Sequence, residues 1–494
     1  MFRACRLYRS RRRYDNFQTA RKVPCLLFQT RNGSNGFGGK TPITSLPGRD
    51  DRRVNAVARS AALRGVILRS ADKFDTKMEP AAYIVVHYHE LWLKQGNRRF
   101  FLHKLRQAMR NALSGLSILR ITQPGDRYVI ETGEASQTEE ALRRLTKVSG
   151  ISHFGVGRAF DWRGLAPDGL LPAICAAAWE EIRDEKFSTF AVRVKRSYKP
   201  FPLGTMEMER EIGGEMYDRL HASGRSVRVD LEQPELTCRI EVTRGPMLVY
   251  GRRIAGPGGL PANTAGRMTC LLSGGFDSAV AAYKMMRRGA HVNFVHFWGG
   301  GADAGESSVH VVRQLVDKLV PWQTTAKLYL VPFESLQREI VREAQEKHRI
   351  LLYRRLMLRI AERISLRERG KGLITGDSLG QVASQTAQNL YAVGAAARLA
   401  IYRPLIGDDK LEIQELARKI GTYAISEEQF HDCCPVFLPK SPELHADPAE
   451  LANEETKYGM TRLVERGLAS MTVEKYRWTD GKVERQSARR KATA

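Results

Sequence analysis

Residues 268–283 read MTCLLSGGFDSAVAAY, which is an apolar run, a glycine turn and a second apolar run. This order predicts a strand, a tight turn and the start of a helix. Gly274 and Gly275 allow the backbone to bend sharply and to come close to a ligand. Such a turn presents backbone N–H groups and a helix N-terminus to an anion, so the stretch predicts a phosphate-binding site.

The side chains of this turn narrow the choice of anion. Ser273 and Ser278 can donate hydroxyl hydrogen bonds, whereas Asp277 would repel a bound anion unless a divalent cation bridges the two. We therefore expect a nucleotide with Mg²⁺, with Asp277 acting on the metal. The turn is not a Walker A loop, because no Gly-Lys-Ser/Thr follows it. It resembles the pyrophosphate loop (PP-loop) of ATP pyrophosphatases; an ordinary Gly-Gly turn is the alternative.

Composition and charge point to a basic, multidomain protein. The chain has 494 residues, enough for two to four domains, and a net charge of +25. Such a charge favours an anionic partner such as nucleic acid, although a merely soluble basic surface is the alternative. No stretch approaches 18 consecutive apolar residues, so we expect no membrane-spanning segment and no membrane partner. The seven scattered cysteines indicate a reducing compartment, and we expect the cytoplasm.

Residues 1–77 form a separate basic segment, with 18 Lys and Arg against 5 Asp and no Glu. Their composition suits a disordered arm. It is also typical of an organellar transit peptide, which would change the expected location. The third interpretation is upstream translation with Met78 as the true start, and we favour it because ordered patterns begin directly after this residue.

Periodicity divides the rest of the chain into four parts. Strands and helices alternate over residues 78–150 as an α+β unit, and a second unit covers residues 151–254. Residues 255–445 repeat the order strand, helix, strand. This order predicts an α/β domain with a parallel sheet whose ligands bind at the carboxyl ends of the strands. Residues 446–494 are polar, and we expect one or two helices with a frayed basic tail.

Three further groups could carry chemistry. Residues 376–386, GDSLGQVASQT, offer amides and hydroxyls that suit recognition of a base or ribose, with a capped polar helix start as the alternative. Arg354 could hold phosphates, although a solvated helix face is the default for such a residue. The adjacent Cys433 and Cys434 are poor joint metal ligands. Their polar setting before Pro435 favours a reactive thiol over two buried ones.

These motifs together resemble those of the tRNA 4-thiouridine synthetases, also called tRNA sulfurtransferases, over residues 83–442. Residues 90–98 resemble the ferredoxin-like domain of that family, and residues 192–214 resemble its THUMP domain, an RNA-binding module. The motifs GGLP at 258–261, SGGFDS, GQVASQT and Lys-Ser-Pro at 440–442 then follow in the order of the family. The resemblance implies a PP-loop ATP pyrophosphatase domain, with helices on both faces of a parallel sheet, preceded by the two α+β domains.

The resemblance also implies a mechanism. ATP with Mg²⁺ would adenylate O4 of a tRNA uridine, at position 8, and sulfur from a cysteine persulfide would then attack C4. Asp277 would serve ATP activation, and Cys434 would receive the sulfur or resolve the persulfide. The implied ATP contacts are Leu271, Leu272, Ser273, Gly274, Gly275, Ser278, His296, Phe297, Arg354, Gly376 and Gln385. The implied RNA contacts are Arg193, Lys195, Arg196 and Lys199.

The sequence departs from some family members, which carry a C-terminal rhodanese domain that holds the persulfide. Only about 50 residues follow Pro442, and they contain no cysteine. We therefore expect the sulfur to come from a cysteine desulfurase or another persulfide donor, and this departure argues against a role in thiamin synthesis. Family resemblance also implies a homodimer.

Two other functions compete with this interpretation. A PP-loop ligase or amidotransferase acting on a small metabolite would leave the basic strand at 189–196 and Cys434 without a role. An inactive RNA-binding protein would not need Asp277 beside an intact glycine pair.

Overall fold

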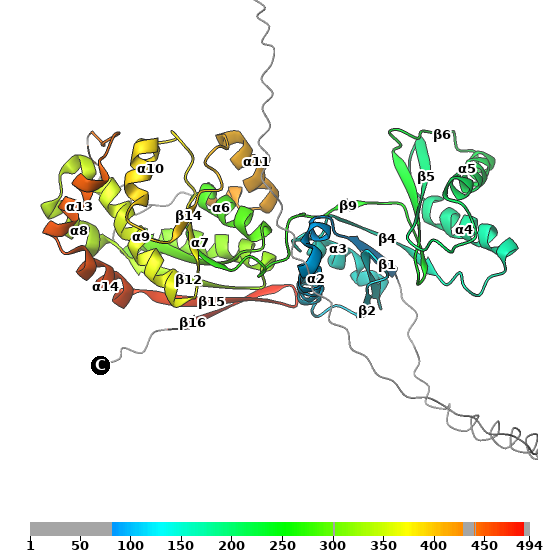
Figure 1. The fold of residues 1–494 in the computed structure, drawn as a ribbon, viewed down its shortest axis with the longest axis horizontal. Helices are drawn as coiled ribbons and strands as arrows, with labels where there is room; N and C mark the ends of the chain where they lie inside the picture. Colours follow the sequence, from blue (N-terminus) through cyan, green and yellow to red (C-terminus); the bar gives the residue numbers. More distant parts are fainter. Residues whose placement is uncertain (1–81, 300–301, 428–438, 440, 489–494) are drawn as a thin grey trace, which may run out of the picture. The chain divides into compact units, whose positions relative to one another are not determined.

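The structure is a computed structural model in which one compact unit, Lys77–Ala494, contains every described residue (Figure 1). The described residues are 82–299, 302–427, 439 and 441–488. The basic segment 1–77 and the cysteine pair at 433–434 lie outside them. Among the described residues, no helix combines the length and the apolar character that a membrane span requires.

Residues 82–160 form an antiparallel sheet covered by helices. Its elements are β1 (Ala82–His87), α2 (Arg98–Ala112), β2 (Ile118–Thr122), β3 (Arg127–Thr132), α3 (Thr138–Leu145) and β4 (His153–Phe160). Strand β1 lies between β3 and β4, and β2 pairs with the outer side of β3. Ile84 and Val86 of β1 pack with Leu105 and Met109 of α2 in one buried cluster. Leu105 and Met109 share a helix face because they are four residues apart.

The same sheet continues through β4 into the next part of the chain. The elements there are α4 (Pro167–Ile182), β5 (Thr189–Arg196), α5 (Thr205–Ala222), β6 (Arg228–Val229), β7 (Leu236–Val242), β8 (Met247–Tyr250) and β9 (Ile254–Ala255). Strand β8 pairs with β4, and the order continues through β7 and β5 to β6. Val192 and Val194 of β5 are buried against Ile212 of α5, whereas Lys195 is exposed. One face of β5 therefore carries the core, and the other presents charge.

Residues 267–488 form the α/β part that the glycine turn predicts. Its strands are β10 (Arg267–Leu271), β11 (His291–Trp298), β12 (Thr325–Pro332), β13 (Gly372–Ile374), β14 (Ala400–Tyr402), β15 (Thr472–Thr479) and β16 (Lys482–Ala488). They lie in the order β14-β13-β10-β11-β12-β15-β16, and the first five are parallel. The carboxyl ends of β10, β11 and β13 therefore meet at one edge of the sheet.

Helices cover both faces of this sheet, as Figure 1 shows. On one face lie α6 (Phe276–Arg287), α7 (Ala302–Leu319) and α11 (Lys410–Ile420). On the other lie α8 (Glu334–Glu343), α9 (Arg349–Arg367), α10 (Ala387–Gly394), α13 (Pro448–Lys457) and α14 (Met460–Ser470). The predicted fold class is confirmed.

The C-terminal segment differs from the expected frayed tail. After α14, β15 and β16 form a hairpin that extends the sheet antiparallel to β12. Tyr476 and Trp478 alternate with charged residues and are buried in the core. Asp480 and Gly481 both have positive φ, 51° and 84°, as a two-residue hairpin turn requires. The alternation and the Asp-Gly pair were signals for a hairpin that the sequence analysis missed.

Candidate active site

The loop between β10 and α6, residues 272–275, leads directly into the first turn of α6. Gly275 precedes α6 in extended conformation, with φ −77° and ψ 147°. A Cβ at Gly275 would meet only Ser273 Oγ, at 3.5 Å, to which Gly275 N donates at 3.3 Å. The N–H groups left for an anion are those of the first turn of α6, which have no partner within the helix. The Ser278 hydroxyl accepts from Ser273 N at 3.0 Å and donates to Gly275 O at 3.0 Å. Ser278 therefore holds the loop in shape.

Asp277 forms an ion pair with Lys410, a residue to which the sequence analysis gave no role. Lys410 Nζ donates to Asp277 Oδ1 at 3.0 Å and to Oδ2 at 2.9 Å. The same ammonium lies 4.3 Å from the centre of the Phe276 ring. Gln381 Nε2 donates to Asp277 Oδ2 at 3.3 Å, which brings the segment after β13 to the loop. Charge and amide groups thus converge on one partly exposed carboxylate at the start of α6.

Gly376 allows this close approach. A Cβ at this position would lie 2.7 Å from Ser278 N and 2.9 Å from the carbonyl carbon of Asp277. Such distances are too short for any residue other than glycine unless the backbone of α6 moves. The segment that follows β13 therefore packs directly on the first turn of α6, next to the loop 272–275. The predicted crevice segment 376–386 and the predicted phosphate loop are brought together.

Arg354 forms an ion pair with Asp377, which sequence analysis did not select as its partner. The Arg354 guanidinium also donates to Ser384 O at 2.8 Å. Asp377 is buried and accepts from Thr375 Oγ1 at 2.7 Å and from Arg403 Nε at 3.2 Å. Burial alone would raise the pKa of Asp377, but Arg354, the Thr375 hydroxyl and Arg403 outweigh it and keep the pKa below its usual value. Asp377 therefore stays ionised and fixes two arginines beside the crevice.

The other predicted ATP contacts lie at the same edge but in different environments. His296 is buried at the end of β11, where Nδ1 lies 2.9 Å from Leu272 O and Nε2 lies 3.2 Å from Ser308 Oγ. Phe297 packs against Phe333, with ring centroids 5.2 Å apart. The side chain of Leu272 is also buried. Gln385 Nε2 lies 3.5 Å from Asp377 Oδ1. Leu272 and Phe297 can therefore contact a nucleotide through backbone atoms but hardly through their buried side chains.

The predicted RNA contacts lie on the other sheet, on β5 and the loop after it. Lys195 Nζ lies 2.8 Å from Asp126 Oδ2. Burial raises the pKa of Asp126, but hydrogen bonds from Lys195 and Arg127 bring it down to about 2. Arg196 donates to the carbonyl oxygens of Lys199, at 2.6 Å, and Phe201, at 3.0 Å. The Arg193 guanidinium donates to Leu231 O. The structure does not bring these cations to the nucleotide loop.

Cys434 lies outside the described residues, but the chain on both sides of it is anchored near the loop. Before it, Tyr423 packs on Phe276, with ring centroids 5.4 Å apart. After it, Thr386 Oγ1 donates to Leu444 O at 2.7 Å and Asn389 Nδ2 donates to Glu443 O at 2.7 Å. The described cysteines, Cys175, Cys238 and Cys270, are all buried. Burial raises the pKa of each thiol, which makes them poor nucleophiles.

Comparison with known proteins finds family models that match three parts of the chain. The family model described as ThiI ferredoxin-like domain matches residues 83–155, and the THUMP domain model matches residues 170–250. The model described as thiamine biosynthesis protein (ThiI) matches residues 263–460. A probable tRNA sulfurtransferase of Thermus thermophilus is 40% identical over 396 residues, which cover 80% of this chain and 94% of that protein. The chain belongs to the tRNA sulfurtransferase family.

Further relatives support this membership. A probable tRNA sulfurtransferase of Thermoanaerobacter pseudethanolicus is 38% identical over 359 residues, covering 73% of this chain and 90% of that protein. Among solved structures, a 4-thiouridine synthetase in complex with RNA and bound ATP matches with a TM-score of 0.71 and 29% identity. The match covers 80% of this chain and 99% of that one. The protein PH1313 from Pyrococcus horikoshii shares the fold, with a TM-score of 0.52, 23% identity, and coverage of 69% and 99%.

Sequence analysis of this tRNA sulfurtransferase family member did not assign a role to three residues that lie at the candidate site, Lys410, Asp377 and Arg403. Asp409, before Lys410, caps α11 in a capping box with Glu412, which is a local signal of a helix start. No local signal indicated that this helix start faces Asp277. From the sequence alone, Asp377 could be taken for a helix cap after Gly376. Its ion pairs with Arg354 and Arg403 arise only because α9 and β14 pack beside β13.

Proposed function

We propose that this chain is an ATP-dependent sulfurtransferase that converts a tRNA uridine into 4-thiouridine. The observation that carries the proposal is the placement of Asp277, in the first turn of α6, against Lys410 and the segment after β13. Two relatives are named probable tRNA sulfurtransferases, and one structural neighbour is a 4-thiouridine synthetase with RNA and ATP. The fold, the loop and the family therefore agree on activation of an RNA oxygen by ATP.

The chain's own groups suit the binding of ATP phosphates. Backbone N–H groups at the start of α6 would hold the phosphates, and the helix N-terminus favours negative charge there. Lys410 is within reach of the same region and would stabilise charge that develops on the phosphates. We infer that Asp277 turns from Lys410 to a phosphate-bound Mg²⁺ when ATP binds.

The residues present fit a metal that arrives with the nucleotide. Among the described residues, no group of three or more His, Cys, Asp and Glu could hold a metal ion. Mg²⁺ commonly binds through one or two carboxylates together with substrate phosphates, and Asp277 supplies one carboxylate. Bound in this way, Mg²⁺ would neutralise charge on the phosphates. Asp277 would orient the complex on the loop.

The chemistry that follows exchanges oxygen for sulfur at C4 of the uridine. O4 would attack the α-phosphorus, releasing pyrophosphate and making AMP the leaving group from C4. The outer sulfur of a persulfide would then attack C4 and displace AMP. We propose that Cys434 either carries this persulfide or supplies the thiolate that cleaves its S–S bond. In either case the cleavage leaves the sulfur on C4 and joins Cys434 to the donor cysteine in a disulfide. The anchored chain at Tyr423 and at Leu444 supports this role, because both anchors lie beside the nucleotide crevice. A cysteine desulfurase or another persulfide donor would supply the sulfur.

Several finer points belong to the same proposal. Residues 151–254 would bind the tRNA, with Arg193, Lys195, Arg196 and Lys199 as contacts. Position 8 would be the target, the enzyme would act as a homodimer, and its place would be the cytoplasm. Lys195 would exchange its Asp126 partner for phosphate on binding.

The test offers the purified chain an unmodified tRNA transcript with Mg²⁺-ATP and sulfide. We expect release of pyrophosphate that depends on tRNA, and 4-thiouridine by nucleoside mass spectrometry. Pyrophosphate release stimulated by small carbonyl compounds and not by tRNA would favour a small-metabolite ligase. tRNA binding without any cleavage of ATP would favour an inactive RNA-binding protein.

A further inference from the structure

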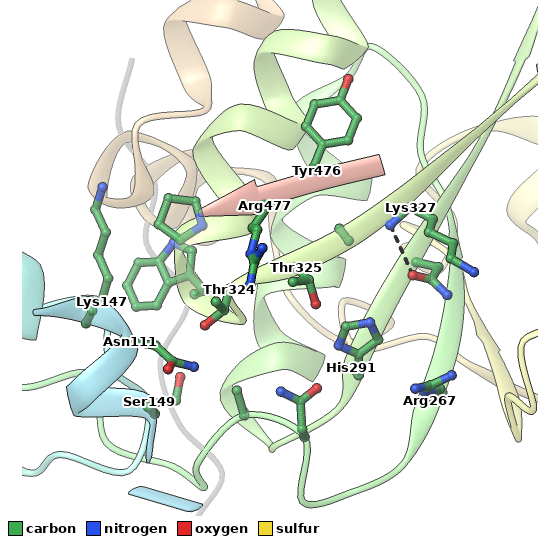
Figure 2. A pocket seen from close by; sticks show the side chains of 18 of the residues that line it. Asn111, Lys147, Ser149, Arg267, His291, Thr324, Thr325, Lys327, Tyr476 and Arg477 are labelled. Atoms are coloured by element: carbon green, nitrogen blue, oxygen red, sulfur yellow. Dashed lines mark hydrogen bonds between the residues drawn. The ribbon is translucent and has the colours of Figure 1, made fainter. Parts of the chain in front are cut away.

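A second polar cavity, of about 850 Å³, lies at the opposite edge of the parallel sheet from the nucleotide loop (Figure 2). Its walls include the first residues of the parallel strands, Arg267 of β10, His291 of β11 and Thr325 of β12. The loop 272–275, in contrast, follows the carboxyl end of β10 and so lies at the other edge of the sheet. Strand β11 runs from His291 to Trp298, about 23 Å at roughly 3.3 Å per residue. Phosphates held by the loop therefore cannot also occupy this cavity.

The lining of the cavity is cationic. It contains six Lys and Arg side chains and two Glu side chains. Lys327 is neutralised by Glu368, with 2.7 Å between Nζ and Oε1. Lys104, Lys147, Lys475 and Arg477 form no ion pair with any described residue, and Glu484 is the one carboxylate left among the lining residues. The cavity thus holds more positive charge than the surrounding residues neutralise.

The strand β15 presents two of these cations in a row. Lys475 and Arg477 are exposed and two residues apart, so they lie on one face of the strand, roughly 6.6 Å from each other along it. This spacing is comparable to that of successive phosphates along a nucleic-acid strand. Figure 2 shows Arg477 beside Thr324 and Thr325, and Lys147 and Asn111 on the facing wall. Cations therefore border the cavity from two sides.

Two further observations indicate that this environment suits an anion. Ser149 lines the cavity and is 2% exposed, yet its hydroxyl has no hydrogen-bond partner among the described residues. Burial and then Arg267 lower the pKa of His291 to about 4. Burial, followed by Arg143 and Lys318, lowers the pKa of Lys147 as well. Burial is the larger cause of both shifts, and neighbouring positive charge adds to each.

We propose that this cavity is a second phosphate-binding site, which holds the sugar-phosphate backbone of the RNA substrate away from the ATP site. The inference rests on the proposed function in its choice of RNA as the ligand. Amide side chains of Gln107, Asn111 and Gln486 add donors and acceptors that suit ribose and phosphate. The chain's own basic segment 1–77 has the wrong charge to fill the site.

The experiment measures tRNA binding by fluorescence anisotropy from about 50 to 200 mM salt, without ATP or a sulfur source. For the full chain with Lys475→Ala and Arg477→Ala, we expect about tenfold weaker binding at low salt. We also expect a salt slope reduced by about 2, one for each phosphate that the variant no longer neutralises. The matched control carries Lys419→Ala and Lys457→Ala, two exposed lysines outside the cavity, and should behave as the unmodified chain. ATP affinity should be unchanged in both.

A variant that is expected to bind tRNA more tightly distinguishes a lost phosphate contact from a damaged fold. Glu484 lies opposite Arg477 across the β15–β16 pair, and Glu484→Gln removes the one unneutralised carboxylate of the lining. We expect this variant to bind tRNA about threefold more tightly, because removing a charge of the same sign as the phosphates strengthens the salt-dependent attraction. A damaged fold would not tighten binding.

The outcomes separate this inference from the proposed function. An unchanged salt slope in the double variant overturns the inference, even if the protein thiolates tRNA. If the double variant binds pyrophosphate or polyglutamate more weakly but keeps its tRNA slope, the inference is also overturned, and the cavity is assigned to a free polyphosphate or to an acidic protein segment. A reduced slope supports it, even if no 4-thiouridine forms. If the unmodified chain binds no tRNA, the inference and the proposed function fall together.

Discussion

Lys410 Nζ lies 3.0 Å and 2.9 Å from the two carboxylate oxygens of Asp277, although 133 residues separate them in the chain. This ion pair lies at the first turn of α6, where the Asp277 carboxylate and the Lys410 ammonium are in direct contact. Both groups are partly exposed, so the ion pair itself adds little stability. Under the proposed function the pair matters for catalysis, because it places a cation beside the carboxylate that we propose to bind Mg²⁺.

Removing either partner should stop activation of ATP. We expect Asp277→Ala to abolish thiolation while tRNA affinity stays within a few-fold. We expect Lys410→Gln to lower tRNA-dependent pyrophosphate release by about 10²- to 10³-fold, the usual loss for a donor aimed at developing charge. Lys419→Gln, on the exposed face of the same helix, is the control and should leave the rate unchanged. A Lys410→Gln protein of normal rate would exclude a role for this ammonium.

Substitution at Cys434 should separate the two half-reactions. We expect Cys434→Ser to block sulfur transfer from a persulfide donor and to preserve ATP-dependent adenylation, because the hydroxyl cannot carry or resolve persulfide sulfur. The measurements are 4-thiouridine by mass spectrometry and pyrophosphate release on the same samples. Cys175→Ser is the control, since this thiol is buried. Normal thiolation by Cys434→Ser with the physiological donor would show that another group carries the sulfur.

A methyl group at Gly376 should displace the first turn of α6 and the adjoining loop 272–275. Its Cβ would lie 2.7 Å from Ser278 N, so the start of α6 must move. We expect Gly376→Ala to weaken ATP binding by at least tenfold, about 1.4 kcal/mol, measured by calorimetry. Gly407→Ala is the matched control, because a Cβ there meets nothing within 4 Å. Equal ATP affinity in the two variants would mean that the loop tolerates displacement.

Glu181 on α4 makes stability depend on pH. Burial raises the pKa of Glu181 to about 7, against the effect of a hydrogen bond from Gly251 N. The folded state thus binds the proton more tightly than the unfolded state, so this group destabilises the fold increasingly as pH rises from about 4.5 to 7. We expect Glu181→Gln to raise the free energy of unfolding at pH 8 by about 2 kcal/mol and to leave it nearly unchanged at pH 4.5. Denaturant titration at both values checks this, and an equal effect at both would contradict it.

The sequence by itself determined the elements whose causes are local. The apolar run before Ser273 and the helix pattern after Asp277 predict β10, the loop and α6 within a few residues, because periodicity and glycine punctuation act over short distances. The repeated strand–helix order predicted the parallel sheet and its ligand-binding edge in the same way. Motif order was enough to indicate the family.

Tertiary structure alone decided which distant side chains meet. Lys410 reaches Asp277, and Asp377 holds Arg354 and Arg403, because the parallel crossovers place β13 and β14 beside β10 and carry α9 and α11 with them. The positively charged cavity exists because the amino ends of the same strands face α2 and the segment after α3. Neither arrangement leaves a local pattern, since each depends on strand order and on residues that lie far apart in the chain.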